Sequence, residues 1–311
     1  MVAKHVVLST EIGFLRMCAQ SLAPGTSHSC LGDVVPGLLA MQGQQVSAVP
    51  HALAARSPQA TGSEVAALFN SRMLVRHRPM RGTVHITAAK DLHWMRVALK
   101  SGYSSWDLRH HTQLGIDSRV IDKACAVAWE EIENRGGQMS RADLFDAWTR
   151  RLQTKHLDGA PQLRQWCTWL MYATMREGAI VEGPAGKNQH LFIDVRQFPA
   201  CDSAESGWVL SPDDREGGIA EVARCYIHGH GPITVADLAW WAGLSKTVAA
   251  GAIHAAIEAD PSIGAFDLAD AGVPPRVIER EPGAGFPAQR SSRRPCRPPR
   301  RGMRDTLLAR L

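Results

Sequence analysis

The segment Gln42-Gly43-Gln44 carries two side-chain amides two positions apart, close to the end of a helix predicted over residues 33–41. An amide offers both a hydrogen-bond donor and an acceptor, although it cannot take up a proton as a general base. Two converging amides could therefore hold a water molecule or a sugar oxygen. A pair of surface glutamines is the simpler interpretation, because positions i and i+2 do not share a face of a helix.

The densest basic patch outside the C-terminal tail lies in a predicted β-hairpin, with strands over residues 75–80 and 83–87. Arg76, Arg78 and Arg81 of this hairpin could contact successive phosphates of a nucleic acid. A solvated surface hairpin would explain the same composition equally well.

Apolar and polar residues alternate along the second strand of this hairpin. Successive side chains of a strand point to opposite faces, so Val84 and Ile86 are predicted to face inward. Thr83, His85 and Thr87 are predicted to face outward. His85 thereby joins the basic surface of the hairpin as a candidate DNA contact.

A second predicted hairpin follows the clearest helical signal of the chain. Over residues 161–176, apolar residues recur at i, i+3, i+4, i+7 and i+8, which is typical of an amphipathic helix. Strands over residues 179–182 and 190–195 follow, joined by a turn rich in glycine. Helices are predicted before it over residues 117–134 and from Ser140 onward. Three helices and a hairpin in this order are typical of a winged-helix unit.

An internal repeat extends this organisation. Residues 137–144 match residues 231–238 at an offset of 94 residues. Ser140 and Thr234 occupy the same place in the two copies and are predicted to cap helices, each with aspartate three positions later. In the second copy only residues 265–268 resemble a following strand, so the last hairpin is predicted to be incomplete.

The predicted fold class is mainly α with small β-hairpins, an α+β fold of tandem winged-helix units. The units are placed at residues 1–100, 101–200 and 208–272. A tail over residues 273–311 differs in composition, with ten arginines, seven prolines and three acidic residues. This composition predicts disorder, because it buries too little apolar surface to offset chain entropy. The tail carries a net charge of +7 within the overall +5, so the rest of the chain is slightly acidic.

Several function classes lack their sequence signatures. The seven cysteines are scattered and never spaced C-x-x-C, which argues against a disulfide framework or a zinc site. No P-loop, G-x-G-x-x-G or G-x-S-x-G motif occurs, so neither a cofactor nor a metal is expected. No apolar run is long enough for a membrane span and no signal peptide is evident. We expect a monomeric cytoplasmic protein, associated with the nucleoid when bound to DNA.

Three segments together resemble one known family, the winged-helix DNA-binding family that includes the AlkZ/YcaQ-type DNA glycosylases. The similarity covers roughly residues 11–245. The segments that carry it are residues 39–44, residues 74–86 with Asp91-Leu-His-Trp94, and residues 224–241. Its most specific parts are Arg81-Gly-Thr-Val-His85 and the stretch from Gly231-Pro to Trp240-Trp241.

The resemblance implies three winged helices arranged around double-stranded DNA and hydrolysis of the N-glycosidic bond of N7-alkylated purines. The Gln-x-Gln or Gln-x-Asp motif of the glycosylase members falls on Gln42 and Gln44, which become the predicted catalytic pair. The predicted DNA contacts are Arg76, Arg78, Arg81, His85, Arg164, Gln165 and Lys187.

Two departures from the family pattern leave alternatives open. Glycine stands between the two glutamines, where the family often has an apolar residue. The Arg/Pro-rich tail stands where the family continues with a β-rich segment, and a shifted reading frame near residue 273 would explain the change. The alternatives are a non-catalytic DNA-binding or transcription-regulatory protein and an inactive truncated family member.

Overall fold

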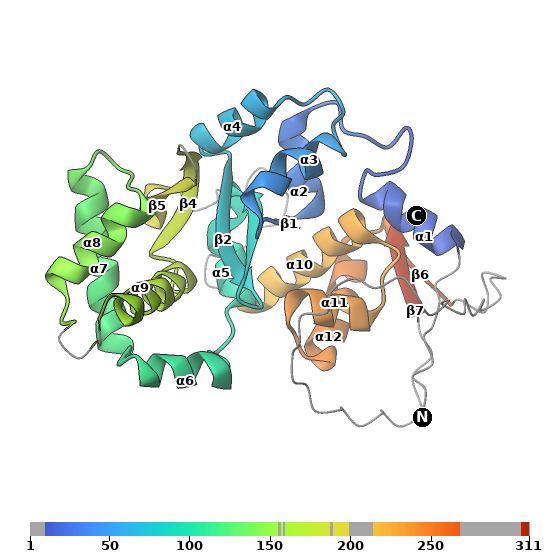
Figure 1. Ribbon diagram of the computed structural model, residues 1–311. Helices are drawn as coiled ribbons and strands as arrows, with labels where there is room; N and C mark the ends of the chain where they lie inside the picture. The colour runs from blue at the N-terminus through green and yellow to red at the C-terminus, as the bar shows by residue number, and fades with distance from the viewer. Residues whose placement is uncertain are drawn as a thin grey trace, which may run out of the picture.

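The computed structural model describes residues 10–154, 157, 159–186, 189–198, 214–267 and 306–310. Within these ranges the fold is mainly helical, with twelve α-helices and a five-stranded antiparallel sheet in the order β1-β3-β2-β4-β5 (Figure 1). This confirms the predicted α+β class. None of the helices in the described ranges is long and apolar enough to cross a membrane.

The N-terminal part contains five helices and three strands. The helices are α1 (Thr10–Ala19), α2 (Val34–Leu38), α3 (Val49–Ala54), α4 (Gly62–Asn70) and α5 (Leu92–Leu99). The strands are β1 (Ala40–Gln42), β2 (Leu74–Met80) and β3 (Thr83–Ala88), and the hairpin β2–β3 agrees with its prediction. Thr61 caps α4: its hydroxyl accepts from the backbone N–H of Glu64, and the Glu64 carboxylate accepts from the backbone N–H of Thr61. Helices α2, α3 and α4 share a core around Leu53 and Phe69.

The middle part contains α6 (Ser105–Gln113), α7 (Ser118–Asn134), α8 (Arg141–Arg151) and α9 (Gly159–Arg176). The hairpin of β4 (Ile180–Ala185) and β5 (His190–Asp194) follows, as predicted. Ser140 caps α8 by accepting from the backbone N–H of Asp143 at 3.1 Å. Trp148 and Trp166 fill a core that α7, α8 and α9 share, so this part has a core of its own.

The two hairpins join into one sheet. Strand β2 pairs antiparallel with β4 through Arg76 and Glu182. Val75 on β2 and Val181 on β4 lie in one buried cluster with Leu92 of α5. Separate hairpins were predicted, and nothing in their sequences indicates that they lie edge to edge.

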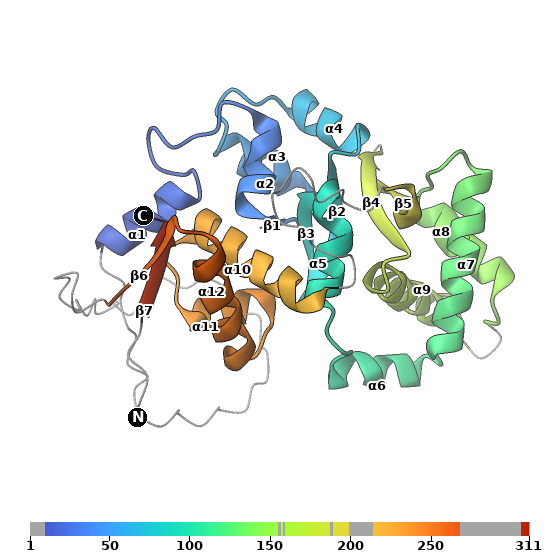
Figure 2. The same cartoon turned by 180° about the vertical axis from the view of Figure 1, so that it is seen from behind.

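The third part consists of α10 (Arg215–His230), α11 (Val235–Ala242) and α12 (Lys246–Ala259). Thr234 caps α11 as predicted, accepting from the backbone N–H of Asp237 at 3.1 Å. These helices share one core with α5 instead of forming their own. A Cβ on Gly229 of α10 would lie 2.5 Å from the carbonyl oxygen of Gly37, so glycine permits this close approach to α2. Figure 2 shows α7–α9 and α10–α12 on opposite sides of β2, β3 and α5.

The end of the chain returns to the third part. Strand β6 (Ile263–Asp267) pairs antiparallel with β7 (Thr306–Arg310) along its whole length. The prediction of a disordered tail over residues 273–311 is therefore wrong for these last residues. Residues 265–268 were predicted to resemble a strand, but nothing in the sequence indicated that the distant end of the chain pairs with it. The rest of the predicted tail lies outside the described residues.

Candidate active site and nucleic-acid interface

Gln42 is the last residue of strand β1 (Ala40–Gln42), and Gln44 lies two residues beyond it, so neither lies at the end of a helix. Helix α2 ends at Leu38, Leu39 turns the chain with a φ of 64°, and β1 pairs Gln42 with His85 of β3. Residues i and i+2 of a strand point to the same side. Both glutamines are exposed while Gly43 between them is buried, which is the alternation expected if the extended chain of β1 continues through Gln44.

Gly43 is fixed on both sides of its backbone. Its N–H donates to the carbonyl of Val84 at 2.9 Å, and its carbonyl accepts from Nε and Nη2 of Arg76 at 3.2 and 2.7 Å. A Cβ at this position would lie 2.8 Å from Cγ1 of Ile86, which is itself buried. The glycine between the glutamines is therefore required by the side chain that faces it.

Arg76 is buried, with 4% of its surface exposed. The expectation of a solvent-facing residue that could bind phosphate is wrong. Besides the Gly43 carbonyl, its guanidinium contacts the carboxylate of Glu182 on β4 in an ion pair. Desolvation lowers the pKa of Arg76 to about 10, so the side chain stays protonated at neutral pH. The charge of Arg76 is therefore used in contacts with Gly43 and Glu182 and is not available to DNA.

His85 is also buried, with 2% of its surface exposed, and the expectation that it faces solvent is wrong. Its Nδ1 lies 3.1 Å from the carbonyl oxygen of Thr83 and must donate, because a carbonyl can only accept. Burial lowers the pKa of His85 to about 4 and that of the neighbouring His77 to about 3. Both rings are neutral at neutral pH and offer no charge to DNA. Thr87 is buried as well, bonded to His77, whereas Val84 and Ile86 face inward as predicted.

Arg78 and Arg81 lie at the tip of the β2–β3 hairpin and stack on aromatic rings. The Arg78 guanidinium lies 3.8 Å from the ring centroid of Tyr172 on α9 and donates to the carbonyl of Gly82. The Arg81 guanidinium lies 4.6 Å from the ring centroid of Trp240 on α11, whose side chain is largely exposed. Within the described residues neither arginine forms an ion pair with a carboxylate. Stacking thus orders two cations and leaves their charge available.

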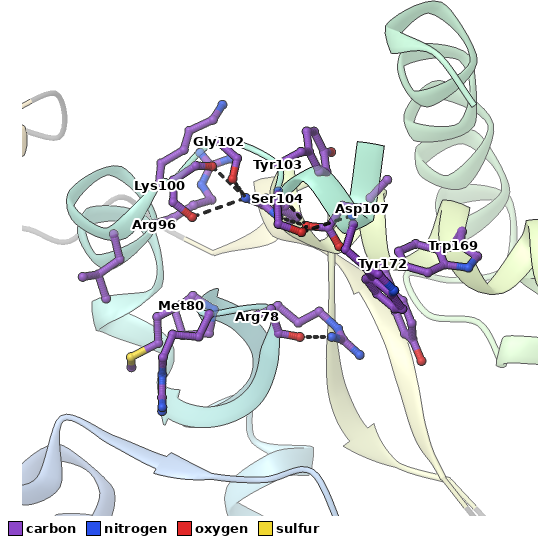
Figure 3. Close-up of a pocket in the computed structure, with 18 of the residues that line it drawn as sticks. Arg78, Met80, Arg96, Lys100, Gly102, Tyr103, Ser104, Asp107, Trp169 and Tyr172 are labelled. Atoms are coloured by element: carbon purple, nitrogen blue, oxygen red, sulfur yellow. Dashed lines mark hydrogen bonds and ion pairs between the residues drawn. The ribbon is translucent and has the colours of Figure 1, made fainter. Parts of the chain in front are cut away.

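A cavity of about 540 Å³ extends from Gln44 and the hairpin tip toward α6 and α9 (Figure 3). Tyr172 and Trp169 lie on one side of it, and Arg96 and Lys100 lie on the other. Trp106 extends the aromatic wall, with its ring centroid 4.8 Å from that of Trp169. Further cations on the lining are Arg78, Arg81 and Arg176, against the single acid Asp107. Of these aromatic residues Trp106 is exposed, Tyr172 is half-buried and Trp169 is buried behind them. Cations beside accessible aromatic rings suit a nucleic acid, which offers phosphates and bases.

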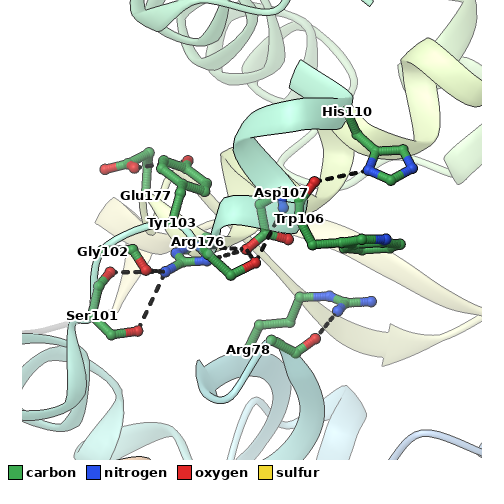
Figure 4. A network of polar contacts seen from close by, with 11 residues as sticks. Arg78, Ser101, Gly102, Tyr103, Trp106, Asp107, His110, Arg176 and Glu177 are labelled. Atoms are coloured by element: carbon green, nitrogen blue, oxygen red, sulfur yellow. Dashed lines mark hydrogen bonds and ion pairs between the residues drawn. The ribbon is translucent and has the colours of Figure 1, made fainter. Parts of the chain in front are cut away.

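A polar network holds the linker between α5 and α6 against α9 (Figure 4). Arg176 donates to the carbonyls of Ser101, at 2.8 Å, and Gly102, and lies 3.5 Å from the Asp107 carboxylate. The Tyr103 hydroxyl donates to Glu177 at 3.0 Å. Arg176 is therefore occupied within the protein, unlike Arg78 and Arg81.

The other predicted DNA contacts lie away from this cavity or outside the described residues. Arg164 and Gln165 are exposed on α9 but do not line the cavity. Lys187 lies outside the described residues. No group of three His, Cys, Asp or Glu side chains that could hold a metal occurs in the ranges the structure covers.

The aromatic residues of the interface were missed from the sequence. They are Trp106, Trp169, Tyr172 and Trp240. An apolar residue on a helix is predicted to be buried, and only the fold shows that Trp106 and Trp240 are exposed, Tyr172 is half-buried and Trp169 is buried. In the Trp240-Trp241 pair, the first ring is 70% exposed and the second is 8% exposed.

Comparison with known proteins gives a family and a related fold. The family model described as DNA glycosylase AlkZ-like matches residues 35–308. Among solved structures, the chain is similar to the Streptomyces sahachiroi DNA glycosylase AlkZ, with a TM-score of 0.59 and 20% sequence identity. The match covers 82% of this chain and 66% of that one, so this chain spans just under two thirds of its relative's length. No curated protein matches at a significant level.

Proposed function

The chain belongs to the AlkZ-like DNA glycosylase family, and on that premise we propose that it binds double-stranded DNA and excises N7-alkylated purines. The observation that supports this proposal is the exposure of Gln42, at the end of β1, and of Gln44, just beyond it, on either side of the buried Gly43. Gln44 also lines the cavity that the hairpin tip and α9 form.

An N7-alkylated purine is already positively charged, so it leaves with the electron pair of the C1′–N9 bond as a neutral base. The enzyme then needs to place a water molecule against an oxocarbenium-like sugar. The two amides orient the water and stabilise the sugar by hydrogen bonding, which is a gain from positioning and preorganised dipoles. The water oxygen bonds to C1′ and its proton passes to solvent. This route needs no carboxylate base, and the amides of Gln42 and Gln44 cannot act as one.

The DNA contacts we propose are the hairpin tip and the surface of α9. Arg78 and Arg81 are ordered cations that pair with no carboxylate in the described part of the chain, and they stack on rings of α9 and α11. Such groups bind phosphates and displace counterions, so their contribution weakens with salt. Arg164, Gln165 and Lys187 remain proposed contacts of the middle part. Arg76 and His85 are left out because both are buried and Arg76 is occupied.

The fold we propose comprises three winged-helix units, at residues 1–100, 101–200 and 208–272. The order α7, α8, α9, β4, β5 supports the middle unit, and α10, α11, α12, β6 supports the last. Pairing of β6 with β7 supplies the second strand that the last unit otherwise lacks.

Incubation of the purified chain with a duplex carrying one N7-methylguanine tests the proposed activity. Free base and an abasic site are expected, and an undamaged duplex of the same sequence serves as control. Tight binding of one DNA sequence without base release would favour a regulator instead. Absence of both binding and release from a folded chain would favour an inactive family member.

A further inference from the structure

The pairing of β1 with β3 ends at Gln42 and His85, and the next position along the two chains departs from a regular ladder. Gly43 lies opposite Val84, and its N–H donates to the Val84 carbonyl as in a hydrogen-bonded antiparallel pair. In a regular pair the Val84 N–H would donate back to the Gly43 carbonyl. Here it donates to Oε1 of Gln44 at 3.2 Å. One backbone bond of the ladder is therefore replaced by a side-chain bond.

Arg76 supplies the donor that the Gly43 carbonyl would otherwise lack. Its guanidinium reaches across from β2 and donates through Nε and Nη2, at 3.2 and 2.7 Å. A buried carbonyl without a partner is costly, so this contact lets the Val84 N–H turn to Gln44. The same carbonyl belongs to the peptide group that precedes Gln44. Holding it also fixes the backbone from which the Gln44 side chain departs.

Glu182 holds Arg76 in this position. The two residues are cross-strand partners on β2 and β4, and the Glu182 carboxylate accepts from Nη1 while Nε and Nη2 face Gly43. Both side chains are largely buried. A buried guanidinium without its carboxylate would be strongly disfavoured, so the pair acts as a unit.

We propose that Arg76 is a positioning residue that orients the Gln44 amide, and that Glu182 of the second hairpin acts through Arg76. The proposal rests on the proposed function, and it specifies how the Gln44 amide is oriented toward the substrate. With one lone pair of Oε1 held by the Val84 N–H, the amide of Gln44 is held in one orientation, and its NH2 group is a fixed donor. In the proposed reaction this group donates to the oxygen of the attacking water, and the amide takes no proton from it.

Kinetics of Arg76→Met give the first test. Methionine keeps an unbranched side chain but removes the donors, and we expect single-turnover base release to slow at least tenfold. Duplex affinity should stay within about twofold, because Arg76 is buried away from DNA. In a Gln44→Ala background the same substitution should have no further effect on the rate. Independent, multiplicative effects of the two substitutions would overturn the proposal.

Two variants separate positioning from loss of stability. Val181→Ala removes buried apolar atoms beside Glu182 and destabilises the same strand without touching Arg76. It should lower the urea midpoint while the rate stays unchanged. Gln44→Glu retains an acceptor for the Val84 N–H but loses the NH2 group, and base release should be lost with DNA binding reduced only modestly. Wild-type rates in Gln44→Glu would contradict the donor role.

A crystal structure of Arg76→Met tests the arrangement even if the wild-type chain releases no base. We expect the Val84 N–H to return to the Gly43 carbonyl and the Gln44 side chain to leave its present position. A Gln44 Oε1 that still accepts from Val84 in this variant would overturn the proposal. If the wild type releases no base but the crystal structure shows the expected change, the proposed function is contradicted and the positioning of Gln44 by Arg76 is supported.

Discussion

Replacing Gly43 by alanine should destabilise the protein through one defined contact. The added Cβ would lie 2.8 Å from Cγ1 and 3.2 Å from Cδ1 of Ile86. Ile86 is fully buried and cannot swing away, so we expect an overpacking cost of about 1–3 kcal/mol. The φ of Gly43 is not positive, and alanine there restricts the unfolded chain, which offsets about 0.4–1 kcal/mol. The expected net loss is about 1–2 kcal/mol.

Urea unfolding of four proteins measures this cost: the wild type, Gly43→Ala, Ile86→Ala and the double variant. Ile86→Ala removes both clashing atoms and by itself should cost about 2–5 kcal/mol. In that background the clash is gone, so Gly43→Ala should raise stability by about 0.4–1 kcal/mol, giving a coupling of about 1–3 kcal/mol. An equal cost of Gly43→Ala in both backgrounds would refute the argument that Ile86 requires the glycine.

Three further predictions concern DNA binding, pH and helix packing. Replacing Arg78 and Arg81 by alanine should weaken duplex binding and make the slope of log affinity against log salt shallower by about 2, as two lost phosphate contacts would; an unchanged slope would exclude the hairpin tip. His85 has a folded pKa of about 4 against about 6.5 when unfolded. Its contribution to stability is therefore complete above pH 6.5 and is lost as pH falls toward 4, by up to about 1.4 kcal/mol per pH unit. His85→Gln should lose less unfolding free energy than the wild type between pH 7.5 and 5, and equal losses would contradict this. Gly229→Ala should lower stability by about 1–3 kcal/mol because its Cβ would meet the backbone of α2. Gly251→Ala, in open space on α12, should instead raise stability by up to about 1 kcal/mol, and similar urea midpoints for the two variants would be inconsistent with the close helix contact.

The local structure followed well from the sequence where capping and periodicity determine it. Ser140 and Thr234 cap their helices as predicted, because a hydroxyl with an aspartate three positions later satisfies the first N–H groups locally. The hairpin over residues 74–88 was likewise set by alternation and its turn. Contacts between these elements depend on long-range packing, and they were not foreseen.

The candidate site shows the same division. Gln42 and Gln44 were noted as a pair of amides and became the predicted catalytic pair through a family resemblance, but the predicted helix end gave them the wrong geometry. A three-residue strand is too short to show alternation, and its partner β3 lies forty residues away in the sequence. Arg76 was grouped with Arg78 by composition alone, although neighbouring strands bury the first and leave the second partly exposed.

The most direct test of the central claim is the single-turnover rate of N7-methylguanine release from a duplex by the wild type, Gln42→Ala and Gln44→Ala. Binding of the same duplex is measured in parallel, since neither residue carries charge. Each variant should bind like the wild type and release base about 10²-fold more slowly, the scale of losing one preorganised hydrogen-bond group. Release by both variants at the wild-type rate, or no release by a wild type that binds the duplex, would contradict the assignment of catalysis to this pair.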